Sequence, residues 1–441
     1  MIKFQELRIN RVQAIAISAI FVVLLSQIFS AKPEIRKYSE NISPTICPSE
    51  PTGVNSVVYL AAKKRGVATI QKGEREFKTQ KTSSISLGSK AKEVEGSGAT
   101  PLQVSVKPQS WMALNQCTSA ISEEWFLGGM STISGIGYFQ FVNPNQSKAV
   151  IDIEIWSEDG KESNQSLVIS SQSTRIVQLN SLVTNKKFLA FHLTARAGRF
   201  SAVLFDERKK GLEKLGGDFV TPNATPKKKV FVTSVFGKIK NQKVKSQFLR
   251  LLAPGEADAL VKVTYLAKSG IYTPVGLADL KAPAGKVIQV PFTSLPTGRF
   301  LALQIEATEP IVASVFSSVK GSVSDFAWSS GSEAINAQNI EAITVPAIGM
   351  NLNVYTEDSS VVVEATTNRK KVNRKNLSGI ATWKIPSNVI SIRIIPGAKP
   401  VFASLSVQDS RGVSVMAIRP VTAIERSALP ISDSEVLTPR K

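Results

Sequence analysis

The chain has 441 residues, and 54 Lys and Arg against 34 Asp and Glu give it a formal net charge of +20. A chain of this length normally divides into several hydrophobic cores, and so basic a surface should attract anionic partners such as nucleic acid, lipid headgroups or wall polymers. With one histidine and two cysteines, a zinc site built from Cys and His is excluded once the two cysteines form a disulfide bond. We expect no cofactor.

Three basic residues near the N-terminus, Lys3, Arg8 and Arg11, precede an apolar run at residues 14–25. This arrangement is typical of an export signal, and the run is intermediate in length between a signal-peptide core and a minimal membrane span. Phe29 does not suit a cleavage site, which favours an uncleaved anchor at residues 1–31. Because the positive charges precede the run, we expect a single-pass membrane protein with an extracytoplasmic C-terminal region, or a secreted protein if the signal is cleaved.

Residues 32–44 are rich in Pro, Ser and charge and are predicted to tether the anchor to the first folded module. Outside the cytoplasm, Cys47 and Cys117 are expected to form a disulfide bond. They stand near the two ends of the first module, so the bond would close a loop of about 70 residues and stabilise it by roughly 4 kcal/mol in the chain-entropy model.

One segment, FLALQIEATEPIVASVF at residues 300–316, is repeated along the chain. It alternates apolar residues with others on both sides of a breaker, which is typical of two strands and a turn. A copy without gaps occurs at residues 188–204, and looser copies occur at residues 102–114 and 401–405. The second and third modules would each supply about six strands, the content of an immunoglobulin-like sandwich.

The sequence therefore predicts an all-β fold of tandem immunoglobulin-like β-sandwich modules, in four related copies, after one N-terminal transmembrane or signal helix. A closed pseudo-fourfold arrangement of the copies is one option. The predicted modules are residues 45–120, 121–215, 216–322 and 323–420, followed by a polar tail at 421–441.

An acidic residue stands next to an aromatic one near each predicted boundary, at Glu124–Phe126, Asp218–Phe219 and Asp325–Trp328. The expected role of the aromatic residue is to fill the junction between neighbouring sandwiches, while a nearby Gly makes the turn. A ligand-binding aromatic platform is the alternative.

Residues suited to catalysis are few. His192, the single histidine, is predicted to lie on a strand surface, and no G-x-S-x-G elbow accompanies it. Asp152 and Glu154 share a strand face and could serve a glycosidase, which needs two carboxylates. Their counterparts in the third module are Lys262 and Thr264, which weakens this alternative of a carbohydrate-active enzyme acting on envelope glycans. We expect a protein that is not an enzyme.

Two basic groups are candidate anion-binding sites, with plain solvated loops as the alternative. They comprise Lys227, Lys228 and Lys229, and Arg369, Lys370, Lys371, Arg374 and Lys375. Export argues against nucleic acid as the partner. We therefore expect a non-catalytic cell-envelope protein that binds or scaffolds, on anionic wall polymers or partner envelope proteins, and that meets the membrane through its N-terminal helix.

Several strand and turn motifs carry a family resemblance. They are Glu124–Phe126, Gly217–Val220, Leu251–Gly255, Ala259–Val263, Ala282–Lys286 and Glu309–Ala313. With them the chain resembles, over roughly residues 45–420, the secreted or membrane-anchored actinobacterial proteins of the domain-of-unknown-function family 5719. The resemblance implies a fold and a location outside the cytoplasm, and it implies no catalytic residue.

Overall fold

The computed structural model describes residues 45–61, 65–72, 76–95, 98–236, 243–292, 300–320, 322–337, 342–357 and 360–420. All of these belong to one compact unit. The predicted anchor, tether and polar tail lie outside the described residues. Within the described ranges, no helix has the length and apolar character needed to cross a membrane.

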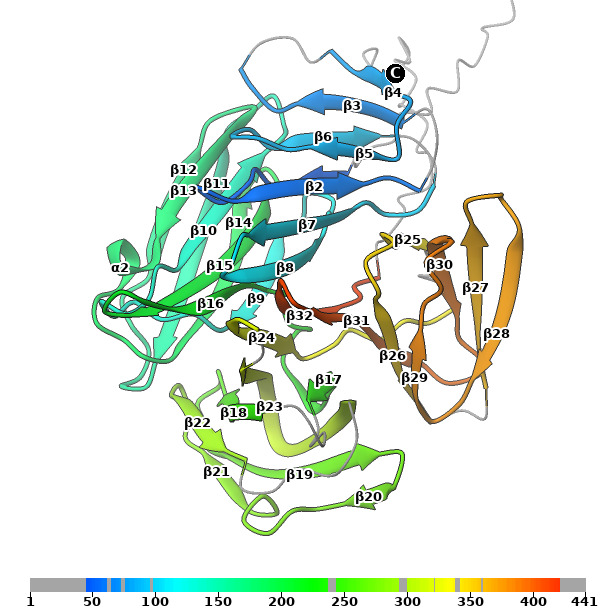
Figure 1. Cartoon of the computed structure of the whole chain (residues 1–441). Coiled ribbons are helices and arrows are strands. Elements are labelled where there is room, and N and C mark those ends of the chain that lie inside the picture. The colour runs from blue at the N-terminus through cyan, green and yellow to red at the C-terminus, as the bar shows by residue number, and fades with distance from the viewer. Residues whose placement is uncertain are drawn as a thin grey trace, which may run out of the picture. The chain divides into compact units, whose positions relative to one another are not determined.

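The described residues form an all-β structure whose strands fall into four sets, here called the four copies (Figure 1). The strands of the first copy are β1 (Thr45–Cys47), β2 (Asn55–Tyr59), β3 (Arg65–Thr69), β4 (Lys78–Gln80), β5 (Ser84–Ser86), β6 (Lys92–Glu95), β7 (Leu102–Lys107) and β8 (Trp111–Gln116). The second copy has β9 (Glu123–Leu127), β10 (Tyr138–Asn143), β11 (Ala149–Ser157), β12 (Gln165–Ile169), β13 (Ser173–Gln178), the helical turn α2 (Leu179–Leu182), β14 (Leu189–Ala197), β15 (Ser201–Lys210) and β16 (Glu213–Val220).

The other two copies follow in the same manner. The third has β17 (Lys227–Phe236), β18 (Lys243–Leu252), β19 (Ala259–Ala267), β20 (Gly270–Tyr272), β21 (Leu280–Ala282), β22 (Val287–Pro291), β23 (Phe300–Lys320) and β24 (Ser324–Ser330). The fourth has β25 (Ala342–Thr344), β26 (Asn351–Thr356), β27 (Val361–Thr367), β28 (Val372–Leu377), β29 (Ile380–Lys384), β30 (Val389–Ile395), β31 (Val401–Asp409) and β32 (Gly412–Ala417).

All four copies share one topology. The first copy pairs its strands in the orders β1-β6-β3-β4 and β5-β2-β7-β8, and the second and fourth copies repeat these orders with their own eight strands. In the third copy the sixth and seventh strands are fused into β23, which pairs with β17 and β19 over its first half and with β18 and β24 over its second. The predicted repeated, sandwich-like all-β fold is therefore confirmed.

Alternation along the strands explains why the sheets stack in pairs. In β11, Ile151, Ile153 and Ile155 are fully buried, whereas Val150, Asp152 and Glu154 between them are partly exposed. Successive side chains of a strand point to opposite faces, so such a strand covers a core on one side and meets solvent on the other.

The strand that follows two of the predicted boundaries belongs to the sheet before it. β16 pairs with β15, and β24 pairs with β23, although the sequence prediction placed residues 216–220 of β16 and the whole of β24 in the next module. Gly216 and Gly217 suggested a turn, but both lie inside β16. They are needed there for close packing, because a Cβ on Gly217 would lie 2.9 Å from the indole of Trp111.

The eighth strands of the four copies meet one another (Figure 1). β8 packs against β16, β16 against β24, β24 against β32, and β32 against β8. The copies therefore close into a ring, and each has a neighbour on both sides.

The junctions of the ring are filled by aromatic side chains. Phe219 packs at 5.3 Å from Phe205, which in turn lies 5.1 Å from Trp111 of the first copy. Phe326 and Trp328 of the third copy pack into the core of the second. The aromatic residues next to the acidic ones thus fill the junctions, as the sequence predicted.

The disulfide bond between Cys47 and Cys117 is present, and both residues are buried. It joins the first strand of the first copy to the residue directly after β8. The predicted bond is therefore confirmed, and it links the C-terminal end of β8 to β1.

Candidate functional site

One carboxylate, that of Asp325, joins all four ring strands. It accepts backbone N–H groups from Met112 of β8 at 3.3 Å, Gly217 of β16 at 3.1 Å, Val413 of β32 at 2.8 Å and its own neighbour Phe326 at 2.8 Å. These strands are sheet edges, whose free N–H groups need partners when they are buried. The acidic residue of the repeated motif therefore satisfies the edges that meet in the ring.

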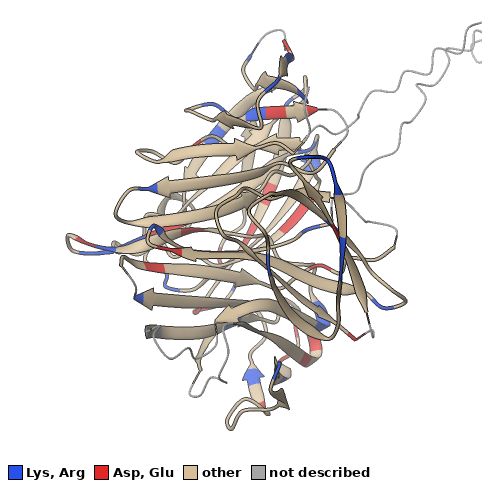
Figure 2. Ribbon diagram, turned by 45° about the vertical axis from the view of Figure 1, so that its right-hand side comes forward, with Lys and Arg blue, Asp and Glu red and all other residues tan. Residues whose placement is uncertain are grey.

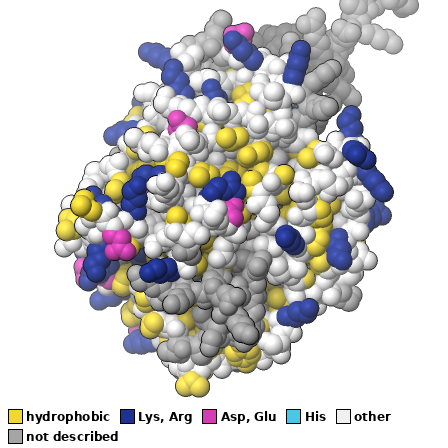
Figure 3. Space-filling model, in the orientation of Figure 1, with side chains coloured by type: hydrophobic (Ala, Val, Ile, Leu, Met, Phe, Trp, Pro, Cys, Tyr) yellow, Lys and Arg dark blue, Asp and Glu magenta, His cyan; other side chains and the backbone are white. Residues whose placement is uncertain are grey.

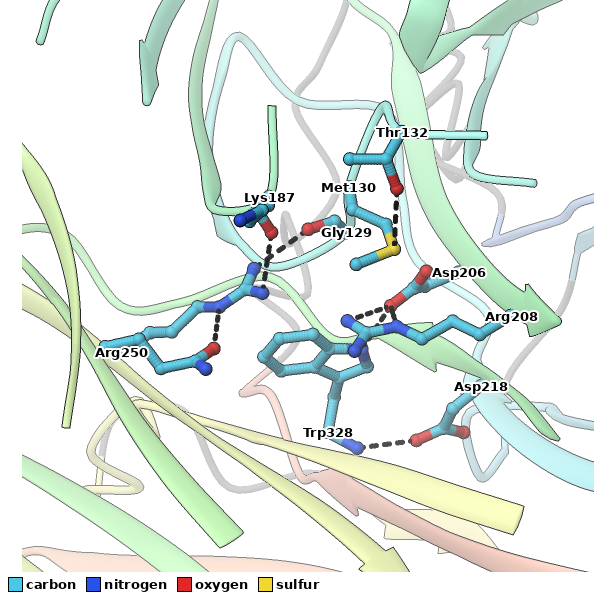
Figure 4. A network of polar contacts seen from close by, with 10 residues as sticks. Gly129, Met130, Thr132, Lys187, Asp206, Arg208, Asp218, Arg250 and Trp328 are labelled. Atoms are coloured by element: carbon cyan, nitrogen blue, oxygen red, sulfur yellow. Dashed lines mark hydrogen bonds and ion pairs between the residues drawn. The ribbon is translucent and has the colours of Figure 1, made fainter. Parts of the chain in front are cut away.

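Asp218 holds the corresponding place in β16. It accepts the backbone N–H of Trp328 at 2.9 Å (Figure 4) and the hydroxyl of Ser414 at 2.8 Å. The Ser414 oxygen accepts in turn the N–H of Leu114 at 3.0 Å. A chain of hydrogen bonds thus runs through the third, second, fourth and first copies.

Burial raises the pKa of both Asp218 and Asp325 well above the ordinary value, while the N–H donors around each carboxylate act in the opposite direction. Both side chains are buried, and their carboxylates are occupied by the donors named above. We assign the two carboxylates a structural role.

Arg250 links the third copy to the second from a fully buried position (Figure 4). Its guanidinium donates to the carbonyl oxygens of Gly129 at 2.8 Å and Lys187 at 2.9 Å and to the side chain of Gln289 at 3.0 Å. It also lies 4.9 Å from the ring of Trp328. Burial lowers the pKa of Arg250 to about 9, and the nearby positive charge of Arg208 adds to the effect.

Arg208 lies on the other side of this network. It donates to Asp206 at 2.8 and 3.0 Å and stacks over the ring of Phe316 at 4.2 Å. The same Asp206 oxygen accepts the indole N–H of Trp328 at 3.0 Å. Two arginines, one aspartate and the tryptophan thus fix the junction between the second and third copies.

A cleft of about 630 Å³ opens between the second and third copies. Its lining consists of Trp125, Glu154, Trp156, Lys161, His192, Pro254, Gly255, Glu256, Ala257, Glu309 and Pro310. Glu154 forms an ion pair with Lys161 at 2.6 Å.

His192 is held inside this cleft on three sides. Its Nδ1 lies 2.8 Å from Glu154 and its Nε2 lies 2.9 Å from Glu123. The imidazole stacks on Trp125 with 4.0 Å between centroids. The sequence prediction of a simple strand-surface residue missed these partners, because Glu123 is 69 residues away on β9 and pairing of β9 with β14 has no local signal.

The aromatic residues of the cleft offer little surface to a ligand. Trp125 is 7 % exposed and Trp156 is 2 % exposed, and their rings stack on each other at 5.5 Å. They fill a junction rather than form a platform.

Asp152 and Glu154, the predicted carboxylate pair, have different surroundings. Asp152 binds Arg196 at 2.6 and 3.1 Å outside the cleft, and these hydrogen bonds lower its pKa. Partial burial opposes ionisation of Glu154, but the bonds from Lys161 and His192 outweigh it and lower the pKa. A glycosidase needs one carboxylic acid with a raised pKa, which this pair does not provide.

The first basic group, at the start of β17, is largely paired. Lys229 binds Glu357 at 3.0 Å, and Lys228 lies 4.0 Å from Glu309. Two of the three cations therefore have an acidic partner, and only Lys227 has no ion pair with a described residue.

The second basic group lies on the hairpin of β27 and β28, at an edge of its sheet (Figure 2). Its five cations are exposed, and Arg374 binds Glu364 at 2.8 Å. The other four, Arg369, Lys370, Lys371 and Lys375, form no ion pair with the rest of the described chain. This hairpin is the candidate anion-binding surface.

The described ranges contain no group of three or more His, Cys, Asp or Glu side chains arranged to hold a metal ion.

Comparison with solved structures gives distant likenesses. A tetra-tandem repeat in the extending region of a large adhesion protein is 12 % identical, over 86 % of this chain and 95 % of that chain, with a TM-score of 0.11. Trypsin-activated alpha-2-macroglobulin from Escherichia coli is 9 % identical, over 85 % of this chain and 35 % of that chain, with a TM-score of 0.09. TM-scores this low carry no argument about fold or function.

No curated protein matches the chain. A family model does match it, over residues 78–378, which is more than half of its length. The chain therefore belongs to DUF5719, a family of unknown function.

Proposed function

We propose that this protein is a non-catalytic, extracytoplasmic component of the cell envelope that binds an anionic wall polymer through the β27–β28 hairpin. The observation that carries the proposal is the concentration of five exposed cations on one edge hairpin with a single ion pair among them. Cations whose charge is not neutralised by neighbours are free to meet the repeated charges of a polyanion.

The shape of the hairpin suits a linear polymer. The cations begin at the turn with Arg369 and continue along β28 to Lys375. A strand rises about 3.3 Å per residue, so the charges from Lys371 to Lys375 extend over roughly 13 Å, with Arg369 and Lys370 in the turn at one end. That length exceeds the Debye length of about 8 Å at physiological ionic strength, and a polymer with several charges would gain from following the strand.

Location outside the cytoplasm rests on the sequence and on the disulfide bond. Disulfides persist in oxidising compartments, and residues 1–31 have the pattern of a membrane anchor or signal. We also propose that the protein comes from an actinobacterium, that it is secreted or membrane-anchored, and that each copy is an immunoglobulin-like sandwich. The last rests on the two stacked antiparallel sheets of each copy.

The alternative, a carbohydrate-active enzyme using Asp152 and Glu154, has less support. Arg196 and Lys161 neutralise the two carboxylates, and neither has the raised pKa that a general acid needs.

The test is a pull-down of the protein on isolated cell walls, with and without their anionic polymers, over a salt series. The variant replaces Arg369, Lys371 and Lys375 by Gln. The matched control replaces three exposed lysines of the third copy by Gln, namely Lys262, Lys268 and Lys286.

Binding should require the anionic polymers. In the variant, the slope of log affinity against log salt should fall by about two to three, because each cation on a linear polyanion releases roughly 0.7 to 0.9 counterions. The control should keep the slope of the unmodified protein. Salt-insensitive binding, or an equal change in the control, would reject the hairpin as the site and point to a partner envelope protein.

A further inference from the structure

Large apolar side chains are exposed to solvent at the turn of the β15–β16 hairpin and on the loop next to it. Leu212, at the turn, is fully exposed, and Ile133 on the neighbouring loop is 95 % exposed. The loop is bonded to the hairpin, because the N–H of Lys209 donates to the carbonyl oxygen of Ser134 at 2.9 Å. The two aliphatic side chains therefore lie at the same end of the second copy.

The turn itself does not require a leucine. Lys210 and Glu213 are the last backbone partners of β15 and β16, so Gly211 and Leu212 form a two-residue turn. Gly211 has a φ of +59°. A positive φ at the first position alone is typical of a type II′ turn, in which glycine is needed first and many residues fit second. Folding therefore leaves the choice of Leu212 unexplained.

Basic side chains surround these apolar ones. Lys209, Lys210 and Lys214 are exposed and form no ion pair with another residue in the part of the chain that the structure describes. Glu213 is the one acidic residue between them. Figure 3 shows hydrophobic and basic side chains side by side at the left edge, where Figure 1 places this hairpin.

We infer that this tip, defined as Ile133, Lys209, Lys210, Leu212 and Lys214, docks on the surface of an anionic lipid bilayer. Apolar side chains at the level of the acyl chains leave water, while long lysine side chains keep their ammonium groups among the headgroups. Anionic headgroups add attraction for each cation near the surface. A hydrated wall polymer offers charge but no apolar phase, so it does not account for Leu212 and Ile133.

The predicted anchor would hold the folded unit within reach of such a bilayer. Residues 32–44 number 13, and a chain of that length spans at most about 45 Å when fully extended. A tethered contact forms at high effective concentration, so even a weak tip would be occupied. The tip lies in another copy than the β27–β28 hairpin, so either site can fail without the other.

The test places a fluorescent probe at the tip. The full chain carrying Leu212→Trp is reconstituted with vesicles of phosphatidylcholine, with and without phosphatidylglycerol, in which brominated acyl chains quench nearby indoles. The matched control is Leu260→Trp, at a leucine that is 58 % exposed on β19 of the third copy. Both variants add one tryptophan to the same five native ones, so the native indoles contribute equally to the two signals.

Leu212→Trp should shift its emission to the blue and lose more fluorescence than Leu260→Trp, and more so with phosphatidylglycerol. Replacing Lys209, Lys210 and Lys214 by Gln in the same background should abolish the gain from the anionic lipid. Equal quenching in the two variants, or no effect of the lysines, would overturn the inference. A blue shift on lipid-free walls but not on vesicles would assign the tip to the wall instead.

Discussion

The carboxylate of Asp325 in the third copy accepts the backbone N–H of Val413 in the fourth at 2.8 Å. Through the same two oxygens it also holds one N–H each of the first and second copies. Four sandwiches that could have been arranged as a rod are therefore joined at one side chain. Stability of the ring should depend on this residue far more than on any surface charge.

Asp325→Ala should destabilise the protein by roughly 3 to 5 kcal/mol, because it leaves several buried N–H groups without an acceptor at about 1 to 3 kcal/mol each. Asp325→Asn should cost less, since its amide oxygen still accepts. Denaturant unfolding gives the free energies, with Asp279→Ala, an exposed aspartate of the same copy, as the control. A loss no larger than that of the control would mean that the ring does not depend on the carboxylate.

Gly412→Ala should be much more destabilising than Gly270→Ala. The two glycines have similar φ angles, +150° and +143°, so an alanine meets similar backbone strain at both. A Cβ on Gly412 would overlap the Asp325 carboxylate, whereas a Cβ on Gly270 would meet nothing within 4 Å. The difference in melting temperature between the two variants therefore measures the clash alone. Equal melting temperatures would show that β32 moves away at little cost.

Local features of the fold could be predicted from the sequence. The isoleucines of β11 alternate with residues of higher exposure, and the repeat between residues 188–204 and 300–316 shows that one module recurs. The disulfide followed from the number and position of two cysteines. Phe219 and Trp328 were expected at junctions because large aromatic residues recur near the ends of modules.

Closure of the ring could not be predicted in the same way. Met112 and Asp325 are 213 residues apart, and no sequence pattern in either segment indicates that the two are in contact. For the same reason, the contacts of His192 with its two glutamates and of Lys229 with Glu357 could not be predicted from the sequence. A run of basic residues reports charge, but only the folded structure shows which of those charges are already paired.

Stability should fall as the pH rises from about 5 to about 8. Burial raises the pKa of Glu124 to about 7, against the opposing effect of Arg419, so the folded state binds a proton that the unfolded state has already lost. The stabilisation is complete below the ordinary pKa and disappears as the pH passes the raised one. Asp218 and Asp325, whose pKa values burial also raises, act in the same direction.

Unfolding free energies across this range provide the measurement for Glu124. Its own contribution to the slope is at most roughly 1.4 kcal/mol per pH unit. Glu124→Gln should flatten the profile between about pH 5 and 7, while Glu213→Gln, at an exposed residue of the second copy, should leave it unchanged. A profile that rises with pH, or one that Glu124→Gln does not alter, would contradict the assignment.

Loss of the Cys47–Cys117 bond should weaken the ring as well as the first copy. The bond closes a loop with a sequence separation of 70 residues, so replacing both cysteines by Ser should cost roughly 4 kcal/mol. Because Cys117 follows β8 directly, the loss should also expose β8 and its partners β16 and β32. Hydrogen exchange of the Met112 and Val413 amides, with and without the bond, tests this coupling. Faster exchange confined to the first copy would mean that the ring holds β8 without help from the disulfide.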